Sequence, residues 1–337
     1  MTTIKDIAKA AGVSVTTVSN VIHGNAGRVS PATIEKIQQI MKEMHYIPNM
    51  GARMLVRNQS KIIGVIIHGY REAKDGTFHS PFTAEIIGAM EREIRLNGYY
   101  MMLYASDSPE EIKNLVANWN VDGIITVGLG MDFCDLLKEW LQIPVVFTDC
   151  FFHEKQYVNV GTEDEEGGYL AAKYLLEHGH CRIGFATEHR ITEREADQCA
   201  DGLRLHGFRR ACMEKGLMWS EQMVVFGEDL KRLRNFTGIV VSSDYYALAL
   251  MDMLRHRGVK IPEELSIIGF DDILMSHFSS PRLTTIHQGV PEKGILAVQQ
   301  LLRQIRGEIV EEKDIRLPVR IVERESVKTL IDSSKRV

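Results

Sequence analysis

Seven short apolar runs alternate with helical segments along residues 61 to 270, and no other feature constrains the fold of this chain as strongly. Continuous Ile, Val and Phe runs of this length indicate strands buried on both faces of a parallel sheet. The amphipathic segments between them supply the helices that cover such a sheet. The pattern predicts an α/β architecture with parallel sheets. The runs are IIGVIIH, YYMMLYA, GIITVG, PVVFTD, RIGFAT, GIVVSS and LSIIGF.

Polar side chains cluster where these expected strands end, which is where α/β sheets bind ligands. An arginine together with carboxylates suits bidentate binding of hydroxyls or of an anionic group. Each residue taken alone could instead cap a helix or form a strand-end ion pair, and Asp244 and Asp272 are favoured as the structural members. The candidates are the loop ending HSPF (79–82), Asp149, the segment carrying Arg204, the pair Ser243 and Asp244, and the pair Asp271 and Asp272.

The N-terminal segment has a different pattern, which predicts an all-α unit of three helices. Thr3 is placed to cap the first helix, and Gly12 suits the left-handed conformation that ends it. Ser14 is the expected cap of the second helix, and Ser30-Pro31 opens the third. This is a helix-turn-helix arrangement, whose second helix enters the DNA major groove. The apolar stripes are Ile4, Ile7, Ala8 and Ala11; Val18, Val21 and Ile22; and Ile34, Ile37, Met41 and Met44.

The outer side of the second expected helix carries short hydroxyl and amide side chains, where an exposed helix more often carries Lys and Glu. Such groups can approach a phosphate oxygen or a base edge closely. A Ser/Thr-rich cap of no consequence is the alternative. The residues expected to contact bases are Val15, Thr16 and Asn20, and those expected to contact the DNA backbone are Thr17 and Ser19.

Charge is distributed unevenly along the chain. Residues 1–61 hold eight Lys or Arg and three Asp or Glu, whereas the whole chain has 40 and 45, a net charge of -5. A basic head on an acidic body indicates a polyanion-binding module joined to a domain with another task. A charged face that is merely solvated is the alternative. Gly51 weakens the connecting stretch NMGARMLVRN as a free-standing helix by about 1 kcal/mol relative to Ala.

Three stretches of the sequence resemble the head and hinge of the lactose-repressor (LacI/GalR) family, and the similarity continues at lower density to the C-terminus. They are TIKDIAKAAGVSVTTVSNVIHG, RVSPATIEKI and YIPNMGARMLVRNQSKIIGVI. The resemblance implies base contacts for Val15, Thr16 and Asn20, and for Arg28 from the loop. It implies phosphate contacts for Ser14, Thr17, Ser19, His23, Ser30, Thr33, Tyr46 and Asn49.

The same resemblance implies a hinge and a two-lobed body. Leu55, flanked by Arg53 and Arg57, matches a leucine that the family wedges into the minor groove, where an apolar wedge kinks the duplex. The body is expected to fold like a periplasmic sugar-binding protein, with an effector in the cleft between its lobes. The expected division is 1–48 for the DNA-binding head, 49–60 for the hinge and 61–337 for the body. Effector contacts are implied for Phe82, Asp149, Arg204, Ser243 and Asp271.

A dinucleotide-dependent oxidoreductase is the strongest enzymatic alternative. The segment GIITVGLGMDF places Gly128 and Gly130 after a strand, and Asp149 follows at the distance of a ribose-binding acid. Phe133 stands at the third glycine position, however, where its bulk would obstruct close packing of helix and strand. A metal cluster of His178, His180 and Cys181 is disfavoured, because His-Gly-His at a helix end more often caps carbonyls.

The remaining expectations concern partners and location. No metal or cofactor and no catalytic residue is expected. A transport-type solute-binding protein shares the body but would need export and has no basic head. Without a membrane-length apolar run or a signal peptide, the protein is expected to be cytoplasmic, associated with the nucleoid when bound to operator. The expected partners are double-stranded DNA with a pseudo-palindromic operator, a sugar or sugar phosphate, and a second copy of the chain. A dimer rather than a tetramer is expected, because the stretch after the last strand-like run RLPVRIVERES, VKTLIDSSKRV, is too short for a leucine-heptad helix.

Overall fold

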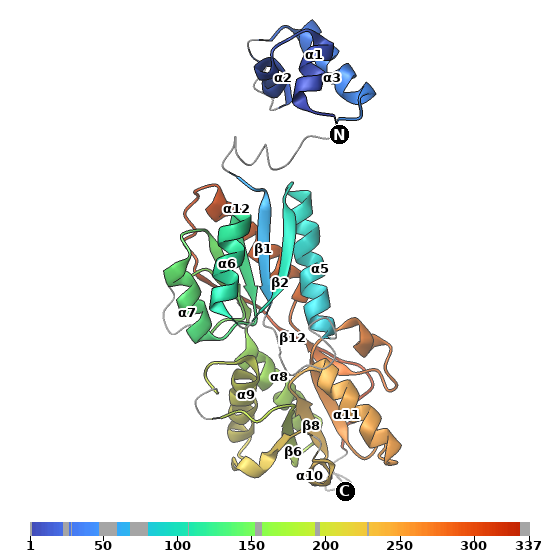
Figure 1. Cartoon of the computed structure of the whole chain (residues 1–337). Helices are drawn as coiled ribbons and strands as arrows, with labels where there is room; N and C mark the ends of the chain where they lie inside the picture. The colour runs from blue at the N-terminus through green and yellow to red at the C-terminus, as the bar shows by residue number, and fades with distance from the viewer. Residues whose placement is uncertain are drawn as a thin grey trace, which may run out of the picture. The chain divides into compact units, whose positions relative to one another are not determined.

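The computed structural model divides into two compact units, residues 1–60 and 61–337. We call them the head and the body and describe each by itself (Figure 1). The structure describes residues 2–22, 27, 29–46, 59–67, 80–106, 108–151, 157–192, 196–227 and 229–330. None of the helices within these ranges is long and apolar enough to cross a bilayer.

The head contains helices α1 (Ile4–Ala11), α2 (Val15–Ile22) and α3 (Pro31–Glu43). Thr3 and Asp6 form a reciprocal capping box at the start of α1, and Gly12 ends that helix with φ 71°. The Thr17 amide donates to Ser14 Oγ over 3.0 Å, and the Thr33 amide donates to Ser30 Oγ over 3.3 Å. The expected caps and the turn between the first two helices are therefore confirmed.

One apolar core joins the three helices of the head. Its buried members are Ile7, Ala8, Ala11, Val18 and Ile37. The predicted stripes supply these residues, so the periodicity in the sequence identifies the packed faces. Ile40 and Met44 pack against the core from the third helix as well.

The first lobe of the body is a parallel six-stranded sheet in the order β11-β5-β4-β3-β1-β2. Helices α5 and α12 pack on one face, and α6 and α7 pack on the other (Figure 1). The strands are β1 (Ile62–Ile67), β2 (Tyr100–Ala105), β3 (Gly123–Val127), β4 (Val145–Thr148), β5 (Asn159–Thr162) and β11 (Asp314–Leu317). The helices are α5 (Pro81–Leu96), α6 (Pro109–Trp119), α7 (Met131–Trp140) and α12 (Val290–Ile305).

The second lobe is a six-stranded sheet in the order β12-β10-β9-β8-β6-β7, parallel except for β12. Helices α8 and α9 pack on one face and α11 on the other. The strands are β6 (Ile183–Thr187), β7 (Val224–Phe226), β8 (Gly238–Val241), β9 (Ser266–Asp271), β10 (Thr284–His287) and β12 (Arg320–Val322). The helices are α8 (Asp164–Glu177), α9 (Ala200–Glu214), η2 (Glu221–Met223), α10 (Leu230–Leu233), α11 (Asp244–His256) and η3 (Leu274–His277).

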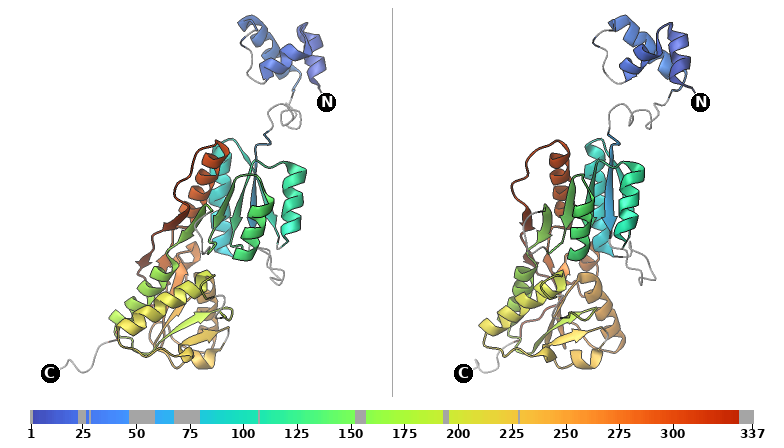
Figure 2. Two further views of the ribbon diagram at one scale, coloured as in Figure 1. Left: turned by 90° about the vertical axis from the view of Figure 1, so that its left-hand side faces the viewer. Right: turned by 60° about the vertical axis from the view of Figure 1, so that its left-hand side comes forward.

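Within the described residues the chain crosses between the lobes three times, from β5 to α8, from β10 to α12 and from β11 to β12 (Figure 2). All seven strands predicted from apolar runs are present. The apolar runs do not predict the short strands β5, β7 and β10. They predict RLPVRIVERES as one strand, whereas the structure divides it around Pro318 into β11 and β12, one in each sheet. The α/β prediction is confirmed. The sequence pattern did not indicate the crossings between the lobes.

Candidate effector site and nucleic-acid interface

Helix α2 presents the face that the sequence analysis assigns to DNA. Val18 is fully buried, whereas Val15 is 44% exposed and Thr16 is exposed. Ser19 and Asn20 are half-buried. The apolar stripe therefore turns inward, and short polar side chains are left at the surface beside Val15.

Two pairs of phosphate-contact candidates in the head lie at helix N-termini. The Ser14 and Thr17 hydroxyls are 2.8 Å apart, and the Ser30 and Thr33 hydroxyls are 2.7 Å apart. Helix N-termini with hydroxyl caps attract phosphate oxygens, because backbone amides and the helix dipole point there. Tyr46 is half-buried and packs against the head core. The other predicted DNA contacts lie outside the described residues; they are His23, Arg28, Asn49, Arg53 and Leu55.

Two acids at strand ends of the body adopt a backbone conformation that is rare for any residue but glycine. Asp149 follows β4 with φ 53°, and Asp271 ends β9 with φ 126°. Non-glycine residues held at positive φ store strain, and such residues concentrate at binding and catalytic sites. Asp272, which follows β9 with φ 63°, shares this conformation, so positive φ occurs at a strand end in each lobe.

A chain of buried hydrogen bonds joins these two acids across the lobes. Lys293 Nζ on α12 lies 2.7 and 2.9 Å from the two carboxylate oxygens of Asp149 and 2.9 Å from Gln288 Oε1. Gln288 Nε2 donates to Asp271 Oδ1 over 2.5 Å. Lys293 and Gln288 are each 1% exposed. The structure thus brings Asp149 and Asp271 into one network.

Sequence reasoning missed both connecting residues. Lys293 had a detectable signal, because it stands at a core position of an amphipathic helix, three residues after Val290 and four before Ala297. A lysine in an apolar stripe needs a buried partner. Gln288 has no such signal, because it lies in the crossing from β10 to α12.

Arg204 is 7% exposed and pairs with Asp164, the first residue of α8. Its Nε and Nη2 lie 2.9 and 2.8 Å from Asp164 Oδ1, and Nη1 donates to the Ser242 carbonyl over 2.6 Å. The guanidinium carbon lies 3.6 Å from the centre of the Phe270 ring. Burial raises the pKa of Asp164, and the positive charge of Arg204 opposes this rise. Because these groups are buried, Arg204→Ala would leave an uncompensated carboxylate and would change folding as well as binding.

Two glycines allow the close approach of helices that makes this pair. A Cβ on Gly207 of α9 would lie 1.8 Å from the Glu165 carbonyl oxygen, and a Cβ on Gly168 of α8 would lie 1.9 Å from the Arg204 carbonyl oxygen. The helices are therefore in backbone contact. This contact places the guanidinium of Arg204 at the N-terminus of α8.

The remaining effector candidates have other contacts. Phe82 is half-buried, with its ring centre 5.4 Å from Lys293 Nζ. Ser243 caps α11 by accepting the Tyr246 amide over 3.2 Å, which is the structural alternative considered for it. Asp244 is fully buried and accepts bonds from the Ile273 amide and the Ser276 hydroxyl, as expected of a structural member.

Comparison with known proteins identifies the family. The family described as "Bacterial regulatory proteins, lacI family" matches residues 3–49, and "Periplasmic binding protein-like domain" matches residues 172–327. The chain is 35% identical to the HTH-type transcriptional repressor PurR of Pasteurella multocida, over 98% of this chain and 99% of that protein. It is 32% identical to PurR of Vibrio atlanticus, over 98% and 100%. The chain belongs to the LacI family.

Two solved structures have the same organisation as this LacI-family chain. The lac repressor dimer bound to operator and the anti-inducer ONPF is 25% identical, with a TM-score of 0.81 over 97% of this chain and 99% of that chain. The complex of transcriptional regulator CelR with cellobiose is 26% identical, with a TM-score of 0.70 over 97% and 100%. This protein is a DNA-binding transcriptional repressor that a small effector regulates, and it is not an enzyme.

The enzymatic alternatives fail in this LacI-family repressor. Gly128 forms the turn after β3 with φ 68°, and Asp149 pairs with Lys293 of α12. His178 Nδ1 lies 2.8 Å from the Tyr174 carbonyl, and His180 lies 3.0 Å from both the Thr237 hydroxyl and the Lys328 carbonyl. These histidines bond to helix ends and loops, as the carbonyl-capping interpretation expects.

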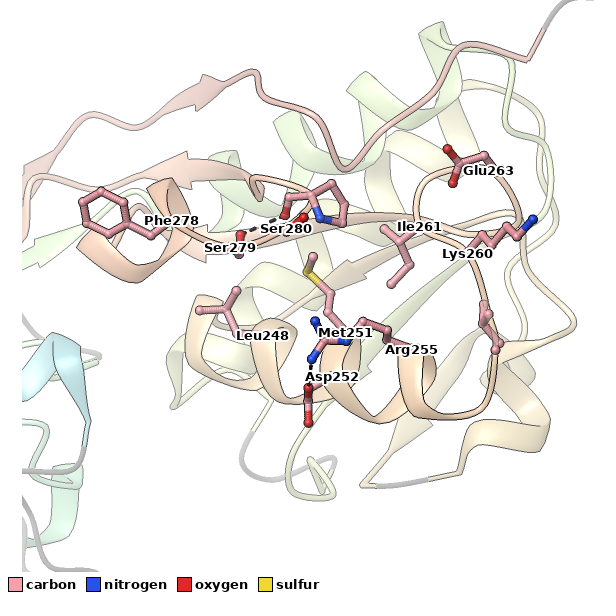
Figure 3. A pocket seen from close by; sticks show the side chains of 13 residues that line it. Leu248, Met251, Asp252, Arg255, Lys260, Ile261, Glu263, Phe278, Ser279 and Ser280 are labelled. Atoms are coloured by element: carbon pink, nitrogen blue, oxygen red, sulfur yellow. Dashed lines mark hydrogen bonds and ion pairs between the residues drawn. The ribbon is translucent and has the colours of Figure 1, made fainter.

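A surface hollow of about 720 Å³ lies on the second lobe of this repressor, away from the strand-end acids. Figure 3 shows Leu248, Met251 and Arg255 on the α11 side, with Ser279 and Ile261 opposite. Asp149, Arg204 and Asp271 do not line it.

Replacing Asp271 with asparagine is expected to reduce the pH dependence of stability. Burial raises the pKa of Asp271 to about 8, although Arg204 opposes the rise. Between the unfolded pKa of about 4 and this value the folded chain binds more protons, so wild-type stability falls as pH rises through that window. Urea unfolding across the window should give a flatter profile for Asp271→Asn. Asp135 is an exposed acid on α7, and Asp135→Asn should keep the wild-type slope of unfolding free energy against pH. Equal slopes for all three proteins would contradict a raised pKa for Asp271.

Proposed function

We propose that this repressor acts as a homodimer on a pseudo-palindromic operator, and that a sugar or sugar phosphate bound between its lobes controls operator affinity. The observation that carries the proposal is the outer face of α2, where short polar side chains and Val15 are exposed on a head that is basic. The relative crystallised as a dimer on its operator supports the DNA part. The relative in complex with cellobiose supports a sugar effector.

The proposed DNA contacts follow from position on the head. Side chains on the exposed N-terminal part of α2 reach base edges, and hydroxyls at helix N-termini bind phosphates. The proposed base contacts are Val15, Thr16, Asn20 and, from the loop, Arg28. The proposed phosphate contacts are Ser14, Thr17, Ser19, His23, Ser30, Thr33, Tyr46 and Asn49.

We further propose the division into a DNA-binding head (1–48), a hinge (49–60) and an effector-binding body (61–337). In the hinge Leu55 enters the minor groove beside Arg53, because an apolar wedge flanked by cations suits a kinked minor groove. Effector binding changes the arrangement of the lobes and thereby the ability of the hinge to form helix on DNA. Coupling of this kind is usually worth about 1 to 3 kcal/mol.

The proposed effector contacts are Phe82, Asp149, Arg204, Ser243 and Asp271. Burial of the hydrogen-bonded network around Asp149 and Asp271 supports the placement, since convergent polar groups in a cleft orient small polar ligands. Ser243 is the weakest member, because its hydroxyl already caps α11. We place the protein in the cytoplasm, where its operator DNA is.

The second copy is proposed to cover an apolar surface on the second lobe. Phe278 is 77% exposed and Leu274 is 68% exposed. Met275 of η3 and Tyr245, at the start of α11, are also exposed. Exposed apolar groups in this number favour a protein interface. Two heads held by one dimer would contact two symmetric half-sites.

The test is selection of operators from random duplexes by the purified protein and by Asn20→Ala. The wild type should enrich a palindrome with a central C-G step. Asn20→Ala should lose preference at one symmetric base position by about 1 to 3 kcal/mol, because an amide that bonds a base edge discriminates to that extent. The measurement is a binding titration on single-base operator variants.

The matched control is Gln39→Ala on α3, an exposed amide of the same head, which should keep the wild-type base preference. Equal weakening of Asn20→Ala on every sequence would remove Asn20 from the base contacts. Enrichment of a single half-site without symmetry would exclude binding as a dimer.

A further inference from the structure

Two cations lie buried in the candidate effector site, and each is already matched by a carboxylate. This inference rests on the proposed effector site and concerns the chemistry of its ligand. Lys293 belongs to α12 of the first lobe and Arg204 to α9 of the second. A sugar phosphate would need at least one of them to be available, because burying a phosphate without a cation is costly.

The ammonium group of Lys293 has three protons and three acceptors. Both oxygens of Asp149 and Gln288 Oε1 lie within 2.9 Å of Nζ, which uses the full donor capacity of an ammonium group. Gln288 Oε1 also accepts the Thr162 hydroxyl over 2.9 Å. The positive charge of Lys293 is therefore neutralised, and its hydrogen-bonding capacity is filled, inside the protein.

Arg204 is occupied in a similar way. Three of its five N–H groups have partners: Nε and Nη2 lie against Asp164, and Nη1 donates to the Ser242 carbonyl. Asp201 Oδ1 lies 3.9 Å from Nη1 and adds a second negative charge. One face of the guanidinium is stacked on Phe270. A phosphate would have to displace a buried carboxylate from either cation.

One buried acceptor at this site has no donor. Asp164 is 2% exposed, and its Oδ2 has no hydrogen-bond partner among the described residues. Asp271 contributes a third carboxyl group next to the two ion pairs. Buried acceptors without donors are satisfied by a ligand that brings O–H or N–H groups.

We propose that Lys293 sets the charge selectivity of the effector site by neutralising Asp149. The site then binds an uncharged compound that donates hydrogen bonds, such as a neutral polyol. It excludes anions, including sugar phosphates. Lys293 acts as a specificity-determining residue, because its ammonium group is bound by the Asp149 carboxylate and is not available to pair with a ligand. Removing the charge of Asp149 should release that cation and create an anion site.

The experiment is isothermal titration of the full-length protein with inorganic phosphate at low ionic strength, without DNA. Asp149→Asn keeps the shape of the side chain and leaves Lys293 without its counter-charge. Phosphate affinity should rise at least about tenfold over wild type. The double variant Asp149→Asn/Lys293→Met should lose this gain. Asp135→Asn adds the same unit of net charge at an exposed site on α7 and should behave as wild type.

The outcomes separate the alternatives. Phosphate binding to the basic head is common to all variants and cancels in the comparison. If the wild type binds phosphate and Lys293→Met abolishes that binding, the proposal is wrong. This comparison does not require Asp149→Asn to fold. A folded Asp149→Asn without any gain, or a gain that survives in the double variant, would overturn it as well. None of these titrations involves the operator, so they can fail while operator selection succeeds.

Discussion

Alanine in place of Gly207 is expected to lower the free energy of unfolding of the body by about 2 to 3 kcal/mol, the usual cost of overpacking a tight contact. The added Cβ would lie 1.8 Å from the Glu165 carbonyl oxygen and 2.6 Å from the Tyr169 amide nitrogen. Both are backbone atoms of α8, so no side chain can rotate away. The two helices must separate, and Arg204, three residues earlier on α9, must move away from Asp164. Urea unfolding followed by circular dichroism measures the loss.

The matched control is Gly88→Ala on α5. A Cβ there meets nothing within 4 Å, and alanine is favoured over glycine within a helix by about 1 kcal/mol. The control should therefore be neutral or stabilising, although it makes the same chemical change in the same kind of element. Equal effects of the two substitutions would show that the close contact of α8 and α9 does not limit stability.

Operator binding is expected to weaken by about a thousandfold or more when salt rises from about 50 to 200 mM, as for proteins that make six to ten phosphate contacts. Two heads with several hydroxyl-capped helix N-termini and basic side chains each would neutralise phosphates and release counterions. The overall charge of -5 does not oppose this, because the acids are concentrated in the body. Fluorescence anisotropy on the selected operator, repeated over a series of salt concentrations, gives the slope.

Charge variants test where that slope originates. Arg53→Gln in the hinge should reduce the slope of log affinity against log salt by about two, because each of the two subunits loses one cation at the DNA. Lys215→Gln, at the exposed end of α9 in the body, should leave it unchanged. A salt response that is flat in the wild type would refute electrostatic binding of DNA by the head.

Local sequence signals were sufficient to predict features that depend on the residues of a single helix or strand. Thr3, Gly12, Ser14 and Ser30 stand where the predicted caps are needed, because capping depends on neighbours within three or four residues. Apolar stripes gave the head core, and continuous apolar runs gave seven strands of the two sheets. The family resemblance and the basic head indicated a DNA-binding repressor, which the comparisons confirmed.

The short strands could not be predicted from the sequence, because they depend on pairing with strands that are distant in the chain. Strand β5 (Asn159–Thr162) has only four residues and includes Asn and Gly, and it is a strand because β4 and β11 lie on either side of it. The run around Pro318 has the pattern of one strand, since nothing in its composition assigns its two halves to different sheets. Pairing partners far apart in the chain decided both cases.

Helix caps, apolar faces and the residue types available for binding can be inferred from the sequence, since each depends on near neighbours. Which polar residues meet depends on the packing of the whole body. Asp149 and Lys293 are 144 positions apart and form a buried ion pair, and Gln288 joins them to Asp271 because the chain crosses between the lobes at that point. Arg204 reaches Asp164 because Gly168 and Gly207 let two helix backbones touch. Long-range contacts of this kind depend on how whole elements pack, which no local pattern of residues specifies.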